Sequence, residues 1–441
     1  MATIFKRNAI LGVIFSLLPL MSGCNQVSNA AAVVPLDGKQ NAHPAVDGAF
    51  AEARALHDRF ITLDTHLDTP VHFSRPGWDI MERHEFFSDR SQVDYPRMQD
   101  GGLDGGFWVI FTQQGPRTPE GHAMALDHAL LVAMRIREMV ARHHEYFEIA
   151  LDAADAKRIV EAGRKVVYIS MENGYPLGTD PRLLETFYQL GVRMFGPVHF
   201  ANNELGDSAT DLSGAQWKGL SEAGRTFVAE ANRLGIVLDA SHASDDVFDQ
   251  MLEWSATPIV LSHSGARAIF DHPRNRDDAR LERLAEHGGV IQMNAFGSYL
   301  RPVPQPPGRV TALRALREAF GSLLGMSPEQ VAAMAERRRE IDREFPIDHP
   351  DLDDFMAHLL HVLELIGPNH VGIGADWDGG GGIEGMWDVA ATPRITERLL
   401  AAGYTEADLA KIWGGNVLRL LQAAQDHAQA VAAAPPSRDP T

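Results

Sequence analysis

Seven histidines and carboxylates follow short apolar runs in the sequence: His66, Asp68, Glu172, His199, His242, His263 and Asp376. Imidazole nitrogen and carboxylate oxygen without thiolate suit zinc, manganese or iron, and zinc is the commonest of these in hydrolysis. So many ligands are too many for one tetrahedral ion. The set therefore favours two ions that share a bridging carboxylate and a bridging water, with a single mononuclear site as the alternative.

His66 and Asp68 are the pair with the clearest spacing. Alternate residues of an extended strand project to the same side, so both side chains can reach one metal ion. A His-x-Asp pair on its own is a weak signal. The other candidates strengthen this signal because they follow successive predicted strands. Histidines that merely pack in a core would not be expected at the ends of one strand after another.

Other polar side chains near these positions allow two interpretations. His199 could be a packed histidine of the barrel, since no metal role requires it. Arg274 lies in a charged loop with Arg276 and could form only a surface ion pair. Asp378 is expected to support Asp376 or to cap a turn. Solvent exposure is expected for a further group of histidines: His72, His143, His144, His358 and His361.

Eight apolar runs alternate with amphipathic helical stretches and would position these residues. They cover residues 60–63, 106–111, 166–169, 192–195, 236–238, 259–261, 290–293 and 371–373. Continuous apolar strands between helices indicate a parallel sheet covered on both faces. Eight such units predict the α/β class and a (β/α)8 TIM barrel, whose active site lies at the C-terminal ends of the strands. The alternative, an open doubly wound sheet, lacks its Gly-rich phosphate loop.

The chain is longer than eight such units require. About eighty residues separate Asn294 from Asp376, and we expect a helical insertion at about 298–365 between the seventh and eighth strands. The barrel domain is then expected to cover residues 50–427. The Ala- and Pro-rich residues 428–441 are expected to form a disordered tail.

The N-terminus has the pattern of a targeting segment. Residues 1–23 hold Lys6 and Arg7, then a short apolar core, then Ser22-Gly23 before Cys24. This resembles a bacterial lipoprotein signal, in which the cysteine is lipidated and becomes the new N-terminus; an ordinary signal peptide is the alternative. Residues 24–49 would form a flexible tether. We therefore expect export to a bacterial cell envelope, with a lipid anchor in a membrane facing the periplasm.

Composition excludes other classes of protein. The 441 residues carry 40 Lys and Arg against 59 Asp and Glu, a formal net charge of -19, so a nucleic-acid partner is not expected. The single cysteine cannot form an internal disulfide and excludes a Cys-rich metal site. Metals would therefore be left to His, Asp and Glu.

Several motifs together resemble the membrane dipeptidase (renal dipeptidase) family of zinc metallopeptidases, within the amidohydrolase-like superfamily. They are the segments 64–70, 172–174, 238–242, 262–264 and 372–379, in the family's order, within a resemblance that runs from about residue 55 to about 425. The resemblance implies a metal-dependent TIM barrel that hydrolyses dipeptides through a metal-bridging hydroxide at two zinc ions per chain. It is also compatible with a homodimer.

The resemblance also assigns roles to individual residues. His66 and Asp68 would bind the first zinc, Glu172 would bridge both ions, and His242 and His263 would complete the second. His199 would lie near the scissile carbonyl, and Asp376 against the bridging water, so that both contact substrate and take part in catalysis. Arg274 would bind the substrate carboxylate, for which its fork of donors is suited, with Arg276 as the alternative carboxylate ligand. The family tends to place a tyrosine after the seventh strand, where this sequence has Phe296, with Tyr299 three residues on. This departure concerns substrate preference more than the reaction.

Two other functions compete with a zinc-dependent dipeptidase. A barrel amidase or deacylase acting on N-acyl amino acids or cyclic amides would turn over blocked substrates and no free dipeptides. A non-catalytic envelope lipoprotein would keep the barrel as a ligand-binding module, and a missing metal ligand would favour it. All the ligands that the resemblance requires are present.

Overall fold

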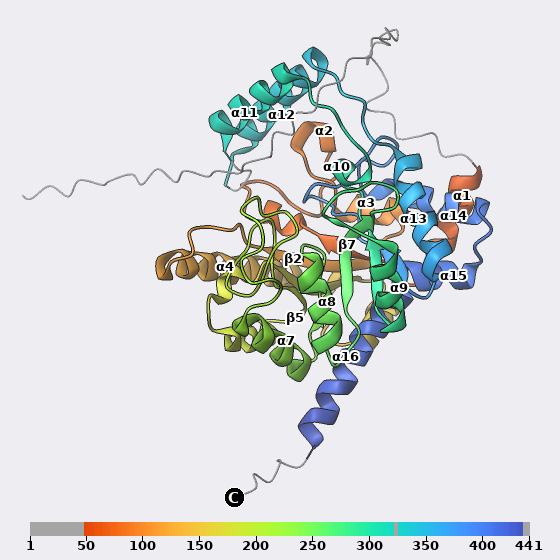
Figure 1. Ribbon diagram of the computed structural model, residues 1–441. Helices are drawn as coiled ribbons and strands as arrows, with labels where there is room; N and C mark the ends of the chain where they lie inside the picture. The colour runs from red at the N-terminus through yellow and green to blue at the C-terminus, as the bar shows by residue number, and fades with distance from the viewer. Residues whose placement is uncertain (1–47, 322–324, 435–441) are drawn as a thin grey trace, which may run out of the picture. The chain divides into compact units, whose positions relative to one another are not determined.

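The computed structural model describes residues 48–321 and 325–434. The strands are β1 Leu63–Leu67, β2 Gly105–Phe111, β3 Phe147–Ile149, β4 Lys165–Glu172, β5 Val192–Gly196, β6 Val237–Leu238, β7 Val260–Ala266, β8 Asn275–Arg276, β9 Val290–Met293 and β10 Val371–Ile373. Helices cover the sheet from outside (Figure 1). The predicted α/β class and barrel fold are confirmed.

Eight parallel strands close into the barrel. One half has the order β1-β2-β4-β5-β6 and the other the order β10-β9-β7, with β8 beside β7. Single parallel bridges join the halves, Asp239 to Val260 on one side and Leu67 to Trp377 on the other. The eight expected runs all lie on these strands, but the first is displaced. β1 begins at Leu63, so Asp64 and His66 lie within the strand rather than after it.

The α-helices alternate with the strands. They are α1 Gly48–His57, α2 Phe86–Asp89, α3 Tyr95–Gly101, α4 Pro119–Arg142, α5 Ala153–Glu161, α6 Leu184–Gln189, α7 Glu222–Leu234, α8 Asp245–Trp254, α9 Asp278–Glu286, α10 Gly297–Leu300, α11 Pro307–Phe320, α12 Pro328–Glu344, α13 Leu352–Ile366, α14 Pro393–Ala401, α15 Glu406–Ala410 and α16 Asn416–Ala433. Many begin at a side-chain cap that accepts a bond from the first turn, as Ser221 does for α7 and Ser244 for α8. Each of these caps marks the residue at which the preceding loop ends and the helix begins.

Two helices form the hairpin that departs from the barrel alternation. α11 and α12 pack on each other, and α12 also packs on α2 (Figure 1). The helix α13, although it lies within the expected insertion 298–365, packs on β7, β9, β10 and α9. It is therefore a helix of the barrel, and the extra segment between the seventh and eighth strands is shorter than the sequence suggested.

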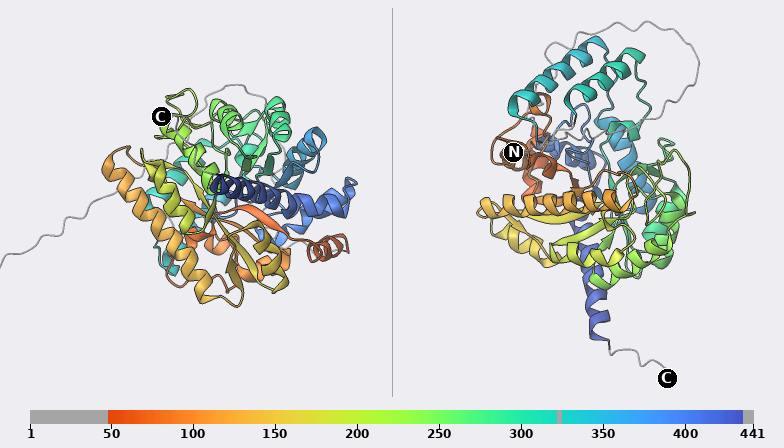
Figure 2. Two further views of the ribbon diagram at one scale, coloured as in Figure 1. Left: turned by 90° about the horizontal axis from the view of Figure 1, so that it is seen from below. Right: turned by 90° about the vertical axis from the view of Figure 1, so that its left-hand side faces the viewer.

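The bottom of the barrel is filled by apolar side chains. Seven of the eight barrel strands and α16 contribute to one cluster, which we call the bottom cluster: Leu63, Phe107, Val166, Tyr168, Met194, Val237, Val260, Val290, Val417, Leu420, Leu421 and Ala424, with Ala150, Ala156 and Ile159 at its edge. Side chains from so many strands meet only in the barrel interior. Seen from below, α16 lies across this end (Figure 2).

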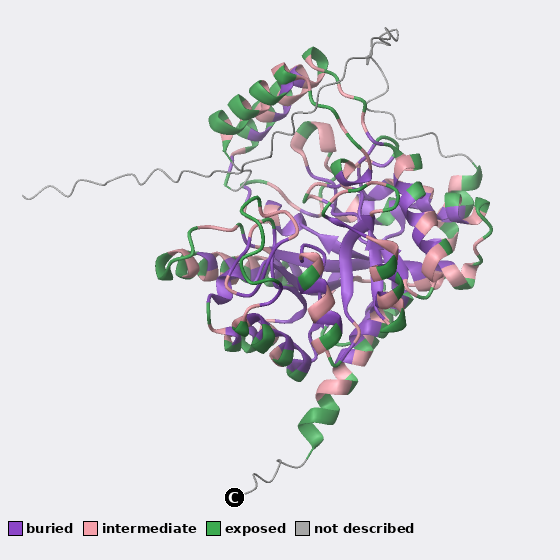
Figure 3. Ribbon diagram, viewed as in Figure 1, coloured by how far each residue is buried: buried purple, intermediate pink, exposed green. Residues whose placement is uncertain are grey.

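The C-terminal segment corrects one expectation. α16 continues to Ala433, so residues 428–433 are helical rather than disordered, although they are largely exposed (Figure 3). The remaining residues of the predicted tail, 435–441, lie outside the described residues, as do the predicted signal 1–23, Cys24 and residues 25–47 of the tether. In the part of the chain that is described, no helix has the length and apolar content needed to cross a bilayer.

Candidate metal centre

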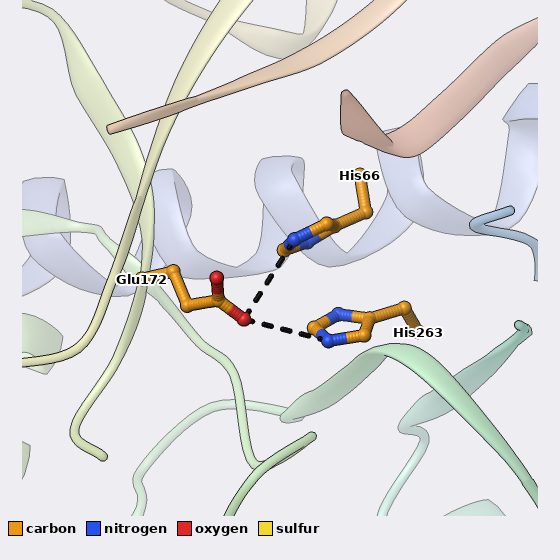
Figure 4. A group of neighbouring side chains, drawn as sticks. All are labelled: His66, Glu172 and His263. Carbon is orange, nitrogen blue, oxygen red and sulfur yellow. Dashed lines mark ion pairs between the residues drawn. The ribbon is translucent and has the colours of Figure 1, made fainter. Parts of the chain in front are cut away.

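Glu172 is the centre of the site. It ends β4, and three imidazole nitrogens face its Oε1: Nε2 of His242 at 2.9 Å, of His263 at 3.4 Å and of His66 at 3.7 Å. Figure 4 shows the rings of His66 and His263 turned toward this carboxylate. Its second oxygen, Oε2, lies 3.8 Å from Nε2 of His199. One carboxylate thus lies within 4 Å of histidines that follow or belong to four different strands.

Three overlapping groups of side chains could each hold a metal ion. They are His66, Glu172 and His263; Glu172, His199 and His242; and His66, Asp68 and Asp376. All seven side chains are buried. The structure therefore brings together all seven metal-ligand candidates named from the sequence, His199 included. That overlap is the arrangement that two ions sharing a carboxylate require.

Two interruptions of strand pairing turn the histidines toward the site. In β1, the register to β2 shifts between Asp64 and Leu67. In β7, the register to β9 shifts between Leu261 and Ser264. Leu63 and Val260 belong to the bottom cluster and therefore point into the barrel. With strict alternation along β1, residues 65 and 67 would also point inward, and His66 would point outward. A bulge changes this parity and redirects a side chain, as bulges near active sites do.

Asp376 is held by a tight loop after β10. Its backbone is left-handed, with φ of 63°, and its carbonyl accepts bonds from the N–H groups of Gly379, Gly380 and Gly381. A Cβ on Gly379 would lie 2.1 Å from Oδ2 of Asp68 and 2.2 Å from Oδ1 of Asp376. Only glycine lets the loop approach both carboxylates so closely.

The donor atoms fit a bound cation. Oε1 of Glu172 and Nδ1 of His242 are buried without a hydrogen-bond partner among the described residues. A buried polar atom without a partner costs free energy, about 1 to 3 kcal/mol. A cation among nitrogen and oxygen donors would satisfy such atoms, and this donor set suits zinc.

Charge and burial set the protonation of the cluster. Burial lowers the pKa of His242, His263 and His199 well below the usual range, and Arg274 lowers each further. Neutral imidazole is the form that binds metals. Burial opposes protonation of His66, yet the carboxylates of Glu172 and Asp68 raise its pKa well above the ordinary value.

The two acids at the centre respond to burial in the opposite way. Burial raises the pKa of Asp376 well above the ordinary value, against the opposing charge of His66. It also raises the pKa of Glu172. A raised pKa makes the Asp376 carboxylate a stronger base, which suits a group that accepts a proton during a reaction.

The two arginines that the sequence left as alternatives occupy different environments. Arg274 is fully buried; its guanidinium donates to Ser241 O, and its Nη2 lies 3.2 Å from Nε2 of His242. Its Nε has no hydrogen-bond partner among the described residues. Arg276 is buried too, but its Nη1 donates to Asp245 at 2.8 Å. Arg274 therefore faces the metal candidates, whereas Arg276 is occupied by an ion pair.

Some polar side chains lie elsewhere than expected. His72 and His358 are 1% exposed, which contradicts the expected solvent exposure. Nε2 of His72 lies 3.1 Å from Asp378, and Asp378 also accepts a bond from Thr69 Oγ1. His358 lies between Ala266 N and Leu300 O. Asp378 thus anchors the segment after β1.

Sequence reasoning did not assign roles to Asp239, Ser262 and Tyr299. Asp239 and Ser262 lie near the candidate ligands His242 and His263 in the sequence and hydrogen-bond to each other. Tyr299 is buried with Arg274 5.4 Å above its ring, while Phe296 stacks on it at 4.5 Å. The signal available for the first two was their place inside the ligand motifs 238–242 and 262–264.

A closed parallel barrel with buried histidines and carboxylates at the carboxyl ends of its strands is the architecture of a metal-dependent hydrolase. The model of the membrane dipeptidase family, peptidase family M19, matches residues 50–435. The chain belongs to this family.

Individual relatives agree. The structure of the probable dipeptidase PvdM from Pseudomonas aeruginosa superposes with a TM-score of 0.73 at 30% identity, covering 86% of this chain and 99% of that one. A metallopeptidase from Rhodobacter sphaeroides, liganded with a phosphinate mimic of L-Ala-D-Ala, gives 0.65 at 25% identity, covering 83% and 99%. An uncharacterized dipeptidase of Schizosaccharomyces pombe is 26% identical over 386 residues, which is 85% of this chain and 83% of that one.

These findings define the activity at a coarse level. The protein is a metallopeptidase that hydrolyses the peptide bond of dipeptides.

Proposed function

We propose that the protein is a zinc-dependent dipeptidase with two zinc ions per chain bridged by Glu172. The observation that carries the proposal is that two of the three overlapping groups of buried candidate ligands share Glu172. His66 and Asp68 would hold one ion, and His242 and His263 the other. When bound, the ions would lower the pKa of a shared water and polarise the peptide carbonyl.

Arg274 would bind the C-terminal carboxylate of the substrate. Its guanidinium is buried beside the ligands, and an arginine fork matches a carboxylate with two parallel hydrogen bonds. A substrate whose carboxylate lies there while its amide lies at Glu172 is short, which fits a dipeptide. Tyr299, beside Arg274, is the aromatic side chain that would line this end of the substrate site.

Asp376 and His199 would perform the proton transfer and charge stabilisation. Asp376 accepts a proton from the attacking water on a carboxylate oxygen and passes it to the nitrogen of the leaving amino acid. His199 presents Nε2 to the site and can stabilise the charge that develops on the carbonyl oxygen. Neither Asp376 nor His199 would form a covalent bond to the substrate carbon.

A dipeptide panel tests this proposal. We expect the full chain to cleave free dipeptides, to lose activity in a chelator and to recover it with zinc. Metal analysis should give two zinc ions per chain. Asp376→Asn should retain the zinc and lose about 10²- to 10⁴-fold in kcat. Turnover of N-acyl amino acids with no cleavage of dipeptides would favour the amidase or deacylase instead.

We further propose that Cys24 carries a lipid that anchors the protein to a membrane of a bacterial envelope, facing the periplasm. The support is the sequence of residues 1–24, with its basic start, short apolar core and Ser-Gly-Cys end. Cys24→Ser should move the protein from the membrane fraction to the soluble fraction of an expressing cell. Equal partition of the variant and the wild type would contradict the anchor. A homodimer, suggested by the resemblance alone, can be tested by light scattering.

A further inference from the structure

Ser262 contacts the rear nitrogens of two candidate metal ligands. Its Oγ lies 2.9 Å from Nδ1 of His263 and 3.4 Å from Nδ1 of His66. The opposite nitrogens of the same rings, both Nε2, face Glu172. One hydroxyl therefore lies behind two ligands from different strands, β1 and β7.

Asp239 fixes the direction of that hydroxyl. It follows β6 and is buried. Its Oδ2 accepts the Ser262 hydroxyl at 2.6 Å, and its Oδ1 accepts the Ser262 N–H at 3.0 Å. The same Oδ1 accepts the hydroxyl of Ser241 at 2.6 Å. Both serine protons are thus directed to Asp239.

Counting protons then fixes the form of His263. Because the Ser262 proton points to Asp239, Ser262 Oγ can only accept from the imidazole, so Nδ1 of His263 carries the hydrogen. A neutral imidazole with its hydrogen on Nδ1 has a lone pair on Nε2. That lone pair faces Nε2 of His242 at 2.9 Å and Oε1 of Glu172 at 3.4 Å.

We propose that Asp239 and Ser262 are positioning residues that hold His263 in its metal-binding tautomer and orient His66 from behind. This inference rests on the proposed metal site. Metal-bound histidines commonly donate their second nitrogen to a carboxylate or carbonyl, and here a serine relays that contact to an aspartate. The shared serine couples ligands of the two proposed ions.

Ser264 provides a matched control for Ser262. It lies on the same strand, on the other side of His263, and is 1% exposed against 0% for Ser262. Its Oγ has no hydrogen-bond partner among the described residues. Replacing either serine by alanine removes one buried hydroxyl, but only Ser262→Ala removes the contact to His263.

The first test observes the tautomer in metal-free protein. The full chain is labelled with ¹⁵N-histidine, stripped of metal at pH 8, and the His263 signals are assigned with a His263→Gln sample. We expect hydrogen on Nδ1 in wild type, Ser264→Ala and Ser262→Thr. In Asp239→Asn the new amide donates to Ser262, whose proton turns to His263, so the hydrogen moves to Nε2. An unchanged tautomer in Asp239→Asn would overturn the inference.

The second test measures zinc affinity by competition with a chromophoric chelator. We expect Ser262→Ala to bind zinc about 10- to 100-fold more weakly than wild type, with Ser264→Ala within about twofold and Ser262→Thr intermediate. Equal affinity of the two alanine variants would refute the positioning role. A wild-type protein that binds no zinc would instead refute the proposed metal site. The tautomer of His263 would still be decided by the first test, because that test uses metal-free protein. Circular dichroism spectra that match wild type confirm that each variant is folded.

Discussion

The two ends of the barrel use the same strands for opposite purposes. At the bottom, Phe107 and Tyr168 stack at 5.0 Å within an apolar cluster covered by α16. At the top, continuing along the same strand β4, Glu172 lies among four histidines. The bottom gains stability by burying apolar surface, whereas the top buries titratable groups that cost stability until a ligand satisfies them. The apolar packing at Tyr168 and the titratable cluster at Glu172 are thus only about four residues apart on β4.

The sharpest way to break this comparison is Glu172→Gln. Loss of the proposed bridging carboxylate should lower kcat/KM for a dipeptide by at least about 10³-fold, equivalent to about 4 kcal/mol, and reduce the bound metal measured by plasma mass spectrometry. The metal-free variant should be at least as stable to urea as metal-free wild type, because a buried carboxyl with a raised pKa is replaced by a neutral amide. Activity within tenfold of wild type would contradict the assignment.

Arg274 offers a second large effect at the top of the barrel. Arg274→Ala should lower kcat/KM for a free dipeptide by about 10²- to 10³-fold, since a charge-assisted pair with the substrate carboxylate is lost. The same variant should treat a dipeptide amide, which lacks that carboxylate, almost as wild type does. Comparable losses on both substrates would assign Arg274 to the metal centre and not to substrate recognition.

At the bottom, Leu420→Ala should reverse the pattern. Leu420 is fully buried against the strands, so the variant should lose about 2 to 5 kcal/mol in the free energy of unfolding. The kcat of the molecules that remain folded should match wild type, because the site lies at the other end. Urea titration combined with active-site counting separates the two quantities. The exposed Val431→Ala, further along α16, serves as the control and should change stability by less than about 0.5 kcal/mol.

The smallest predicted effect concerns the pH dependence of stability and a residue outside both ends of the barrel. His57 of α1 is buried between Gly101 O and Thr396 Oγ1, and burial lowers its pKa to about 4. Because the unfolded chain binds the proton at its ordinary pKa of about 6.5, stability contributed by this site is complete above that value and lost as the pH falls toward 4. Between pH 7 and pH 5 the loss should be about 2 kcal/mol.

His57→Gln tests this by removing the titration. Between pH 7 and pH 5, the variant should lose about 2 kcal/mol less of its free energy of unfolding than wild type does, as measured by urea unfolding at each pH. His144→Gln, an exposed histidine, should behave as wild type. A wild-type slope in His57→Gln would show that other buried histidines account for the acid sensitivity.

Much of the fold could be predicted because its signals are local. A run such as 106–111 is apolar throughout, as a strand covered on both faces must be, and eight such runs permit few architectures. The extent of the insertion could not be predicted. α13 has an amphipathic pattern like any other helix, and only its packing on β7 and β10 shows that it belongs to the barrel. His72 and His358 were misjudged for a related reason, since their burial depends on partners about 300 and 90 residues away, Asp378 and Ala266.

The sequence by itself determined which side chains could form the centre, because the carboxyl ends of parallel strands meet at one rim and ligand types are fixed by chemistry. Tertiary structure alone decided how they are aimed. The bulges in β1 and β7 reverse the strand parity that would have turned His66 away, and the bond from Ser262 to Asp239 joins residues whose adjacency exists only in the closed barrel. It also separated Arg274 from Arg276, two residues apart in the chain, by giving only Arg276 an ion-pair partner in Asp245.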